Sequence, residues 1–391
     1  MPPQVTTALA TAGVSAPWSH QVAGAELVRA GRSTVVATGT ASGKSLCYLL
    51  PALAAALEHE SSSGLGGTPT TLYLSPTKAL AADQLRALTS LGLPGLRAAT
   101  YDGDTPTEAR DWVRRHAWYV LSNPDMLHRS VLPGHPRWAR FLRDLRYVVV
   151  DECHRYRGVF GSHVASVLRR LQRVCAHYGG SPVFVLASAT VSEPEVAAAR
   201  LVGHDVVPVT VDGSPRGELL FALWEPPFTD YAGEHDAPVR RSAVAEAADL
   251  MTDLVVGGAR TVTFVRSRRA AETVAASARR LLAEVDPALA DRVAAYRAGY
   301  LPEERRALEA ALQSGLLLGV ASTSALELGV DVAGLDAVVL AGWPGTRASL
   351  WQQAGRAGRA GQGALAVLVA RDDPLDTYLT HHPAAIFGRP V

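Results

Sequence analysis

Cysteine is scarce in this sequence, and the spacing of the few that occur excludes the simplest metal sites. The chain has three cysteines, Cys47, Cys153 and Cys175, and none of them forms a CxxC pair. Structural zinc sites ordinarily need such closely spaced ligands. We therefore expect no zinc site within these residues, and the low cysteine count fits a reducing, cytoplasmic compartment.

Long apolar runs are missing as well. No run reaches the ~20 residues that a membrane-spanning helix needs, so we expect no membrane span. The segment Met1–Val14 has no basic start followed by an apolar stretch, and we expect no signal peptide there. Glycine and proline are dispersed rather than clustered, which argues against a long disordered tract.

Lysine is almost absent. Of the 38 basic residues only two are lysines, Lys44 and Lys78. The net charge of +1 is small for a protein that coats nucleic acid, but it does not exclude a protein that contacts nucleic acid over a small part of its surface. Because a compact ammonium interacts differently from a planar guanidinium, the surroundings of the two lysines are of particular interest.

The pattern along the chain predicts two α/β domains. Its 391 residues are long for one core and suit two domains of roughly 150–200 residues each. Short β-branched runs alternate with Ala- and Leu-rich helical stretches, which predicts mainly parallel sheets with helices on both faces. The pattern weakens between about 211 and 239, where Pro, Gly and acidic residues accumulate, so we expect domains at 1–215 and 216–391. The expected strands are 33–38, 71–75, 118–122, 147–151 and 183–188, then 261–265, 317–322, 337–341 and 364–370, with a helix over 269–284.

A loop of small residues follows the first expected strand and precedes a helical stretch. Small residues let backbone N–H groups approach phosphate oxygens, and the helix N-terminus favours the same anion. Lys44 would reach the β- and γ-phosphates of ATP, and the Ser45 hydroxyl would hold Mg²⁺. The loop departs from the strict pattern at its first position, and a glycine-rich turn without a ligand is the alternative. Its residues are Thr38, Gly39, Thr40, Ala41, Ser42, Gly43, Lys44 and Ser45.

Two adjacent acids, Asp151 and Glu152, end the apolar run that begins at Tyr147. Buried strands rarely end in unpartnered charge, because such charge is costly. Mg²⁺ held through Asp151 would supply the partner, and Glu152 would polarise the water that attacks the γ-phosphate. A strand end capped by solvated acids is the alternative.

Two arginines, Arg356 and Arg359, lie three positions apart in the second expected domain. In a helix they would share one face, and a solvated basic face is the alternative. Directed at ATP, they would stabilise charge on the transferring phosphoryl group, an effect on the order of 10³–10⁵ in rate.

With these motifs in place, the chain resembles superfamily 2 helicases of the DEAD/DEAH type over essentially its whole length. The resemblance implies two RecA-like domains and a role for each matching segment. Gln21 would read adenine. Strand contacts would come from Pro76, Thr77 and Lys78, and from Asn123, Pro124 and Asp125. The box Asp151–His154 names the family, and Ser188, Ala189 and Thr190 would couple hydrolysis to strand movement. Contacts to strand and nucleotide would come from Thr323, Ser324, Gly329, Asp331 and Gln352.

The segments Asp151–His163 and Arg297–Arg306 resemble the YprA/MrfA-type branch, which is similar to RecQ in outline. That resemblance implies a 3′→5′ DNA helicase linked to repair, which uses ATP and Mg²⁺ and acts on single-stranded or tailed duplex DNA. An RNA helicase is an alternative, although the last motif begins with Gln352 rather than the histidine usual in RNA helicases. A translocase without strand separation and a non-hydrolysing nucleic-acid-binding module remain open as well.

Two further features lead to expectations. In the family that the chain resembles, a C-terminal region with a four-cysteine zinc site follows. We therefore expect residues 1–391 to be a truncated or minimal motor that hydrolyses ATP and unwinds poorly. Arg137, Arg140, Arg143 and Arg146 recur every three residues. They would form either a solvated helix face, which we favour, or a face that tracks phosphates.

Overall fold

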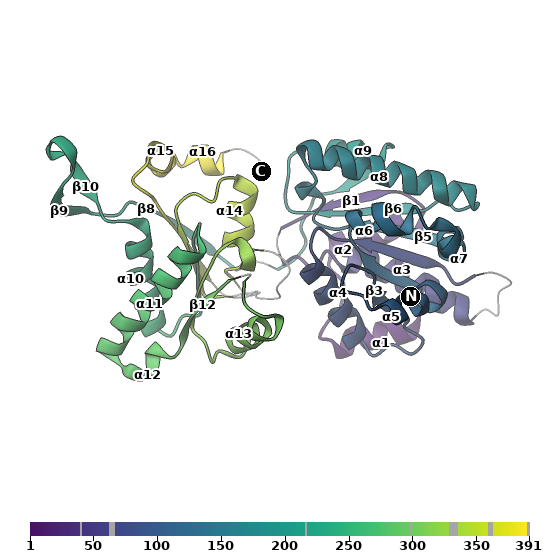
Figure 1. Cartoon of the computed structure of the whole chain (residues 1–391), viewed down its shortest axis with the longest axis horizontal. Helices are drawn as coiled ribbons and strands as arrows, with labels where there is room; N and C mark the ends of the chain where they lie inside the picture. Colours follow the sequence, from purple (N-terminus) through teal and green to yellow (C-terminus); the bar gives the residue numbers. More distant parts are fainter. Residues whose placement is uncertain are drawn as a thin grey trace. The chain divides into compact units, whose positions relative to one another are not determined.

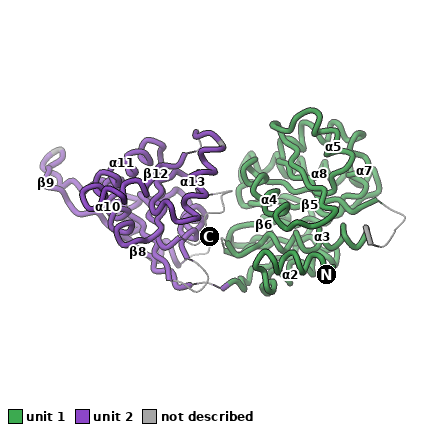
Figure 2. The backbone as a smooth tube through the Cα atoms, turned by 90° about the horizontal axis from the view of Figure 1, so that it is seen from below, with its two compact units in different colours: residues 1–214 green, residues 215–391 purple. Residues whose placement is uncertain are grey.

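The computed structural model describes residues 1–39, 41–61, 67–215, 217–297, 299–327, 335–358 and 363–388. The chain divides into two compact units, Met1–Ser214 and Pro215–Val391 (Figure 2). Each unit has a parallel sheet between helices, so the predicted α/β fold class is confirmed. In the ranges described, no helix is long and apolar enough to cross a membrane.

The first unit is built on a seven-stranded sheet in the order β3-β4-β2-β5-β6-β1-β7, with every neighbouring pair parallel (Figure 1). Its central strands are mostly buried because helices cover both faces, as their apolar runs predict, and Arg146 of β5 is the exposed exception. The strands are β1 Thr34–Ala37, β2 Thr70–Leu74, β3 Ala98–Thr100, β4 Tyr119–Ser122, β5 Leu145–Val150, β6 Val183–Ser188 and β7 Val207–Val209.

Alternation along these strands divides the unit's core in two. Tyr73 and Val149 pack beneath α1–α4, whereas Leu74 and Val150 pack beneath α5, α7, α8 and α9. The helices are α1 Pro3–Thr11, α2 Ser19–Arg29, α3 Leu46–Ser61, α4 Lys78–Ser90, α5 Thr107–His116, α6 Pro124–Met126, α7 Ala139–Arg143, α8 Gly158–His177 and α9 Pro194–Val202.

The second unit has a six-stranded parallel sheet in the order β12-β13-β11-β14-β15-β8. Helices α10 and α11 pack on one face, and α13 to α16 pack on the other. The strands are β8 Leu219–Trp224, β11 Thr261–Phe264, β12 Val293–Tyr296, β13 Gly319–Ser322, β14 Ala337–Ala341 and β15 Ala364–Val369. The helices are α10 Ala243–Val256, α11 Arg268–Val285, α12 Pro287–Ala290, α13 Pro302–Ser314, α14 Arg347–Ala354, α15 Pro374–His381 and α16 Ala384–Phe387.

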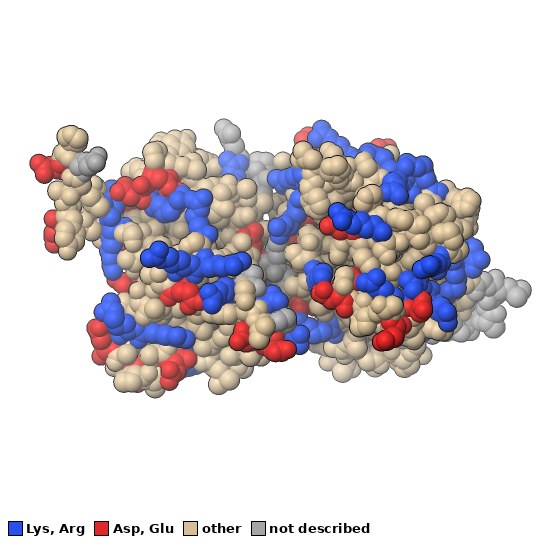
Figure 3. Space-filling model, viewed as in Figure 1, with Lys and Arg blue, Asp and Glu red and all other residues tan. Residues whose placement is uncertain are grey.

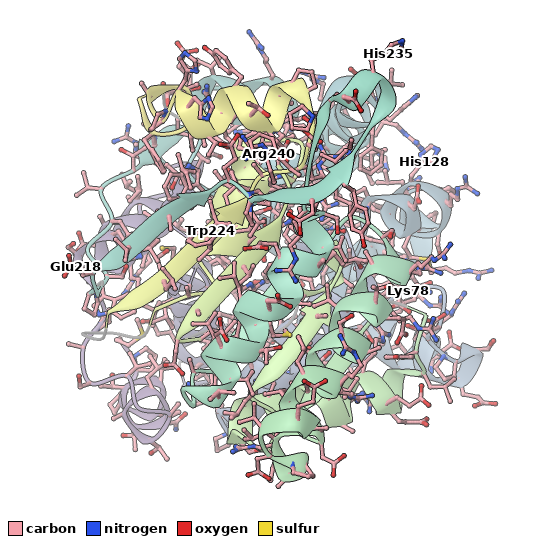
Figure 4. All side chains as sticks on the ribbon, turned by 90° about the vertical axis from the view of Figure 1, so that its left-hand side faces the viewer. Lys78, His128, Glu218, Trp224, His235 and Arg240 are labelled. Atoms are coloured by element: carbon pink, nitrogen blue, oxygen red, sulfur yellow. The ribbon has the colours of Figure 1, made fainter. Side chains whose placement is uncertain are left out.

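The segment in which the sequence pattern weakens contains regular structure that the prediction missed. Strand β8 pairs in parallel with β15, and β9 (Phe228–Ala232) and β10 (Pro238–Arg240) form an antiparallel hairpin. Figure 4 shows Arg240 near the base of this hairpin and His235 at its turn. The Arg240 guanidinium lies 4.0 Å from the centre of the Phe228 ring and 3.1 Å from a Glu225 carboxylate oxygen.

The four periodic arginines do not form one helix face. Arg137 lies in the 3-10 turn His135–Trp138, Arg140 and Arg143 lie in α7, and Arg146 lies in β5. The four arginines therefore belong to three different elements, so the prediction that they form one solvated helix face is wrong. Basic and acidic side chains are interspersed over the surface of each unit in the view of Figure 3, as the small net charge implies.

Candidate nucleotide-binding site

The candidate nucleotide residues lie at the carboxyl edge of the first sheet. The glycine-rich loop follows β1, and Asp151 and Glu152 follow β5. Strand β6 lies between β1 and β5, and Ser188, Ala189 and Thr190 come at its end. Parallel strands bring these three segments to one edge, which is where open α/β sheets bind ligands.

The glycine-rich loop is held in its conformation by its own side chains. The hydroxyls of Thr38 and Ser42 lie 2.7 Å apart, and the Ser42 hydroxyl donates to the Gly39 carbonyl at 2.8 Å. Ala41 and Gly43 have positive φ values of 58° and 61°, which lets the backbone curl tightly between β1 and α3. Thr40 lies outside the described residues.

Lys44 directs its ammonium into this loop. Its Nζ donates to the carbonyls of Gly39 at 2.7 Å and Thr38 at 3.2 Å. Burial lowers the pKa of Lys44, and the negative charges of Glu152, Asp151 and Asp212 oppose that shift. The ammonium and the two motif carboxylates therefore act on one another, as a site for magnesium and phosphate requires.

Asp151 is almost completely buried, and both of its carboxylate oxygens accept hydrogen bonds. Oδ2 accepts from the Tyr73 hydroxyl at 2.5 Å, and Oδ1 accepts from the backbone N–H of Glu152 at 2.9 Å. Burial raises the pKa of Asp151. Glu152 has a φ of 50°, in the left-handed region that a non-glycine residue rarely adopts. Such strained backbone is typical of functional sites.

His154 joins the acidic box to the segment after β6. The Ala189 N–H donates to Nδ1 at 3.2 Å, which places the ring proton on Nε2, 3.3 Å from a Glu152 carboxylate oxygen. Burial, helped by the positive charges of Arg157, Arg155 and Lys44, lowers the pKa of His154 to about 3. The neutral imidazole thus connects Glu152 to the predicted coupling residues Ser188–Thr190.

Gln21 lies against the glycine-rich loop. Its Nε2 donates to the Gly43 carbonyl at 3.0 Å, and its Oε1 accepts from the Trp18 N–H at 2.8 Å. A Cβ at Gly43 would stand 2.5 Å from the Gln21 Nε2, so any other residue at position 43 would have to displace this amide. The adenine-reading role of Gln21 stays a prediction.

Two residues that the sequence analysis missed also hold the loop. The Asp212 carboxylate accepts from the Gly39 N–H at 3.0 Å, and the buried His20 contacts the Ser42 carbonyl through Nε2 at 2.8 Å. The Gly213 N–H donates to the other ring nitrogen of His20 at 3.2 Å. His20 could have been suspected as the neighbour of Gln21. Asp212 gave no signal, because its contact with Gly39 spans most of the unit.

The predicted strand-contact residues of the first unit follow β2 and β4, which are neighbours in the sheet. Thr77 caps α4 by accepting from the Leu80 N–H at 3.3 Å, and Asn123 caps α6 by accepting from the Met126 N–H at 2.8 Å. Lys78 is exposed, and the hydrogen bond from its Nζ to Asp104 at 2.7 Å raises its pKa. Pro124 is the buried first residue of α6, and Pro76 and Asp125 belong to the same two turns.

In the second unit, the turn after β13 is bonded to α14 and to Arg356. Thr323 and Ser324 begin this turn, and its last residue, Glu327, accepts from the Gln353 Nε2 at 2.8 Å through its carboxylate. The Arg356 guanidinium donates to the Glu327 carbonyl at 2.6 Å. Gln352 is buried beside Gln353. The predicted residues Gly329, Asp331 and Arg359 lie outside the described residues.

Each unit matches the model of a known family of protein domains. The first unit matches the DEAD/DEAH box helicase model over residues 18–199, and the second matches the helicase conserved C-terminal domain over residues 246–361. The chain belongs to the DEAD/DEAH box helicases. The family predicted from the sequence motifs is thereby confirmed.

Individual members of the DEAD/DEAH box family support the same family assignment. The chain is 41% identical over 390 residues to the uncharacterized ATP-dependent helicase YprA of Bacillus subtilis, covering 99% of the chain and 50% of YprA. It is 39% identical over 378 residues to the ATP-dependent helicase HRQ1 of Saccharomyces cerevisiae, covering 94% and 34%. A crystal structure of the DUF1998 helicase MrfA bound to DNA and AMPPNP has a TM-score of 0.91 at 40% identity, covering 100% of this chain and 53% of MrfA. The chain thus spans about half or less of the length of these helicases.

Proposed function

We propose that this chain is an ATP-hydrolysing motor that moves along single-stranded DNA. One observation carries the proposal. Lys44, in the loop after β1, and the adjacent acids Asp151 and Glu152, after β5, are far apart in the sequence but come to the same carboxyl edge of the first sheet. Lysine and paired carboxylates at the end of parallel strands are the parts that phosphoryl transfer from ATP requires.

The residues present suit Mg²⁺ as well as ATP. The Asp151 carboxylate and the Ser45 hydroxyl offer hard oxygen donors, which Mg²⁺ prefers, and these two residues would hold the ion. When bound, Mg²⁺ neutralises charge on the β- and γ-phosphates. The glycine-rich loop would wrap the phosphates, and Lys44 would exchange its bonds to the Gly39 and Thr38 carbonyls for bonds to phosphate oxygens.

Glu152 would orient and polarise the attacking water. Its carboxylate lies within hydrogen-bonding distance of the neutral His154 ring, whose other nitrogen accepts from Ala189. A change at the γ-phosphate would reach Ser188–Thr190 through this chain of bonds. We further propose that Gln21 reads adenine, that Gly329, Asp331 and Gln352 contact nucleotide, and that Arg356 and Arg359 stabilise charge on the transferring phosphoryl group.

The nucleic-acid partner is proposed from the relatives and from the capped turns. A crystal structure shows MrfA bound to DNA, and a structure of Mycobacterium smegmatis Lhr, 27% identical to this chain, shows Lhr bound to single-stranded DNA. Thr77, Lys78 and Asn123 in the first unit and Thr323 and Ser324 in the second would hold the strand backbone without reading sequence. Movement 3′→5′, action on tailed duplexes in DNA repair and a cytoplasmic location complete the proposal. An RNA substrate and translocation without strand separation are the competing proposals.

Two substitutions test the nucleotide site. Lys44→Ala should abolish phosphate release while the fold is retained, because the side chain acts on phosphate and not in the apolar core. Glu152→Gln should retain binding of a fluorescent ATP analogue and lose hydrolysis. Circular dichroism controls for folding in both variants. Near-normal phosphate release by either variant would remove the basis of the proposal.

A further inference from the structure

Tyr73 is a completely buried residue of β2 that contacts the candidate metal ligand directly. Its hydroxyl donates to Oδ2 of Asp151 at 2.5 Å. We infer that Tyr73 is a positioning residue, which fixes the orientation in which the Asp151 carboxylate meets the magnesium ion. The inference rests on the proposed ATP hydrolysis and adds to it a residue outside the helicase motifs.

The sheet explains why a tyrosine at this position reaches the carboxylate. Strands β2 and β5 are parallel neighbours, and Tyr73 stands opposite Val149. Because side chains alternate along a strand, Asp151 points to the same face as Val149, and hence to the face of Tyr73. The backbone N–H of Asp151 donates to the Leu74 carbonyl at 2.9 Å, which keeps the two strands in register up to the acid. A long side chain at position 73 therefore ends beside the carboxylate.

The hydrogen bond from Tyr73 fixes the carboxylate because the two oxygens of Asp151 are held from different directions. Oδ2 accepts from Tyr73 on β2, and Oδ1 accepts from the Glu152 backbone after β5, so the two donors together define the plane of the group. A tyrosine phenol, whose ordinary pKa is about 10, is protonated at neutral pH and is therefore a hydrogen-bond donor. Partners of this kind, which contact a metal ligand rather than the metal, orient the ligand and raise metal affinity.

The chain offers a matched control for the loss of a buried tyrosine hydroxyl. Tyr48 of α3 belongs to the same core cluster, and its ring centre lies 5.9 Å from that of Tyr73. The Tyr48 hydroxyl, however, donates to the Gln84 side chain at 3.3 Å and not to the carboxylate. Tyr73→Phe and Tyr48→Phe thus remove the same atom from the same core, and only Tyr73→Phe removes the contact with Asp151.

The experiment measures binding of a fluorescent ADP analogue as Mg²⁺ is titrated, and separately in EDTA. Tyr73→Phe should raise the Mg²⁺ concentration for half-maximal binding by about 10-fold. In EDTA, the affinity of Tyr73→Phe for the ADP analogue should equal that of the wild type. Tyr48→Phe should require the same Mg²⁺ concentration for half-maximal binding as the wild type. In an Asp151→Asn background, Tyr73→Phe should add no further shift, and this comparison holds even if the single variant is less stable.

Three outcomes would overturn the inference. These are a wild-type Mg²⁺ titration for Tyr73→Phe, an equal shift for Tyr48→Phe, or an equal loss of nucleotide affinity in EDTA. In each case, ATP hydrolysis by the wild-type chain would still support the proposed function. A wild-type chain that neither hydrolyses ATP nor responds to Mg²⁺ would instead refute the proposed function itself.

Discussion

Several ionisable residues lie close together, and largely buried, at the carboxyl edge of the first sheet. Asp151 and His154 are both buried, and Lys44 lies close enough for their charges to interact. Burial alone disfavours every charged form, so each group depends on its partners. Lys44 and Asp151 stabilise each other's charge, whereas the same Lys44 charge helps burial to keep His154 neutral.

His154 should make the first unit sensitive to acid. Its folded pKa of about 3 lies below the ordinary histidine value of about 6.5, so the unfolded chain binds a proton that the folded chain excludes. The contribution of His154 to the free energy of unfolding is fully present above about pH 6.5. It falls by up to about 1.4 kcal/mol for each pH unit between there and about pH 3. Urea unfolding at several pH values measures this slope, and His154→Gln should flatten it.

The control for that slope is the exposed His116, which lies at the end of α5. His116→Gln shows how much of any change in the slope comes from replacing a histidine as such. If His154→Gln and His116→Gln gave the same slope, the buried neutral state of His154 would be wrong.

At the scale of elements, the conformation of the glycine-rich loop depends on a positive φ at Gly43 and on the side chains that pack against that residue. Gly43 and Gly92 have the same φ of 61°, but of the two only Gly43 lies against other side chains, those of Gln21 at 2.5 Å and Trp18 at 3.3 Å from the place of a Cβ. Gly92, after the end of α4, has open space where a Cβ would stand. The two glycines therefore separate the cost of the backbone conformation from the cost of displacing Gln21.

Gly43→Ala and Gly92→Ala should each lower the free energy of unfolding by about 1 kcal/mol, because both place a Cβ in the left-handed region. Only Gly43→Ala should also weaken ATP binding, since its Cβ displaces the Gln21 amide from the loop. Thermal unfolding and titration with a fluorescent ATP analogue measure the two effects. Equal ATP affinities in the two variants would show that the contact with Gln21 does not shape the loop.

The elements that the sequence predicted are those whose signal is local. Strands such as β4 and β6 are almost entirely apolar because both of their faces are buried, and that burial is visible in the residues themselves. Strand β8 was missed although Leu219–Trp224 is apolar, because the surrounding Pro, Gly and acidic residues were given too much weight. Contacts such as Asp212 with Gly39 and Tyr73 with Asp151 could not be predicted, since they depend on which strands become neighbours.

At the scale of the whole molecule, each unit carries its own sheet and its own share of the proposed motor. The first unit holds the glycine-rich loop and the acidic box, and the second holds Arg356 on a turn bonded to Glu327. A function that uses both sets requires residues of the second unit to affect chemistry whose other parts lie in the first. That dependence is open to a direct test.

Arg356→Ala should reduce ATP turnover strongly while it weakens ATP binding much less, because the proposed contact is strongest in the transition state. Arg359→Ala should behave in the same way. The control is Arg347→Ala, since Arg347 is the first residue of α14, the helix that precedes Arg356, and donates to the Ala385 carbonyl instead. Steady-state phosphate release and nucleotide binding separate kcat from affinity. Wild-type turnover in Arg356→Ala would show that this arginine takes no part in hydrolysis.

The central claim is that the chain couples ATP hydrolysis to single-stranded DNA, and the rate of phosphate release with and without such DNA tests it most directly. The account predicts that single-stranded DNA raises the wild-type rate several-fold, that RNA of the same sequence raises it less, and that Lys44→Ala stays inactive with either. A wild-type rate that is the same with and without nucleic acid, or a rate that DNA raises equally in Lys44→Ala, would contradict the account.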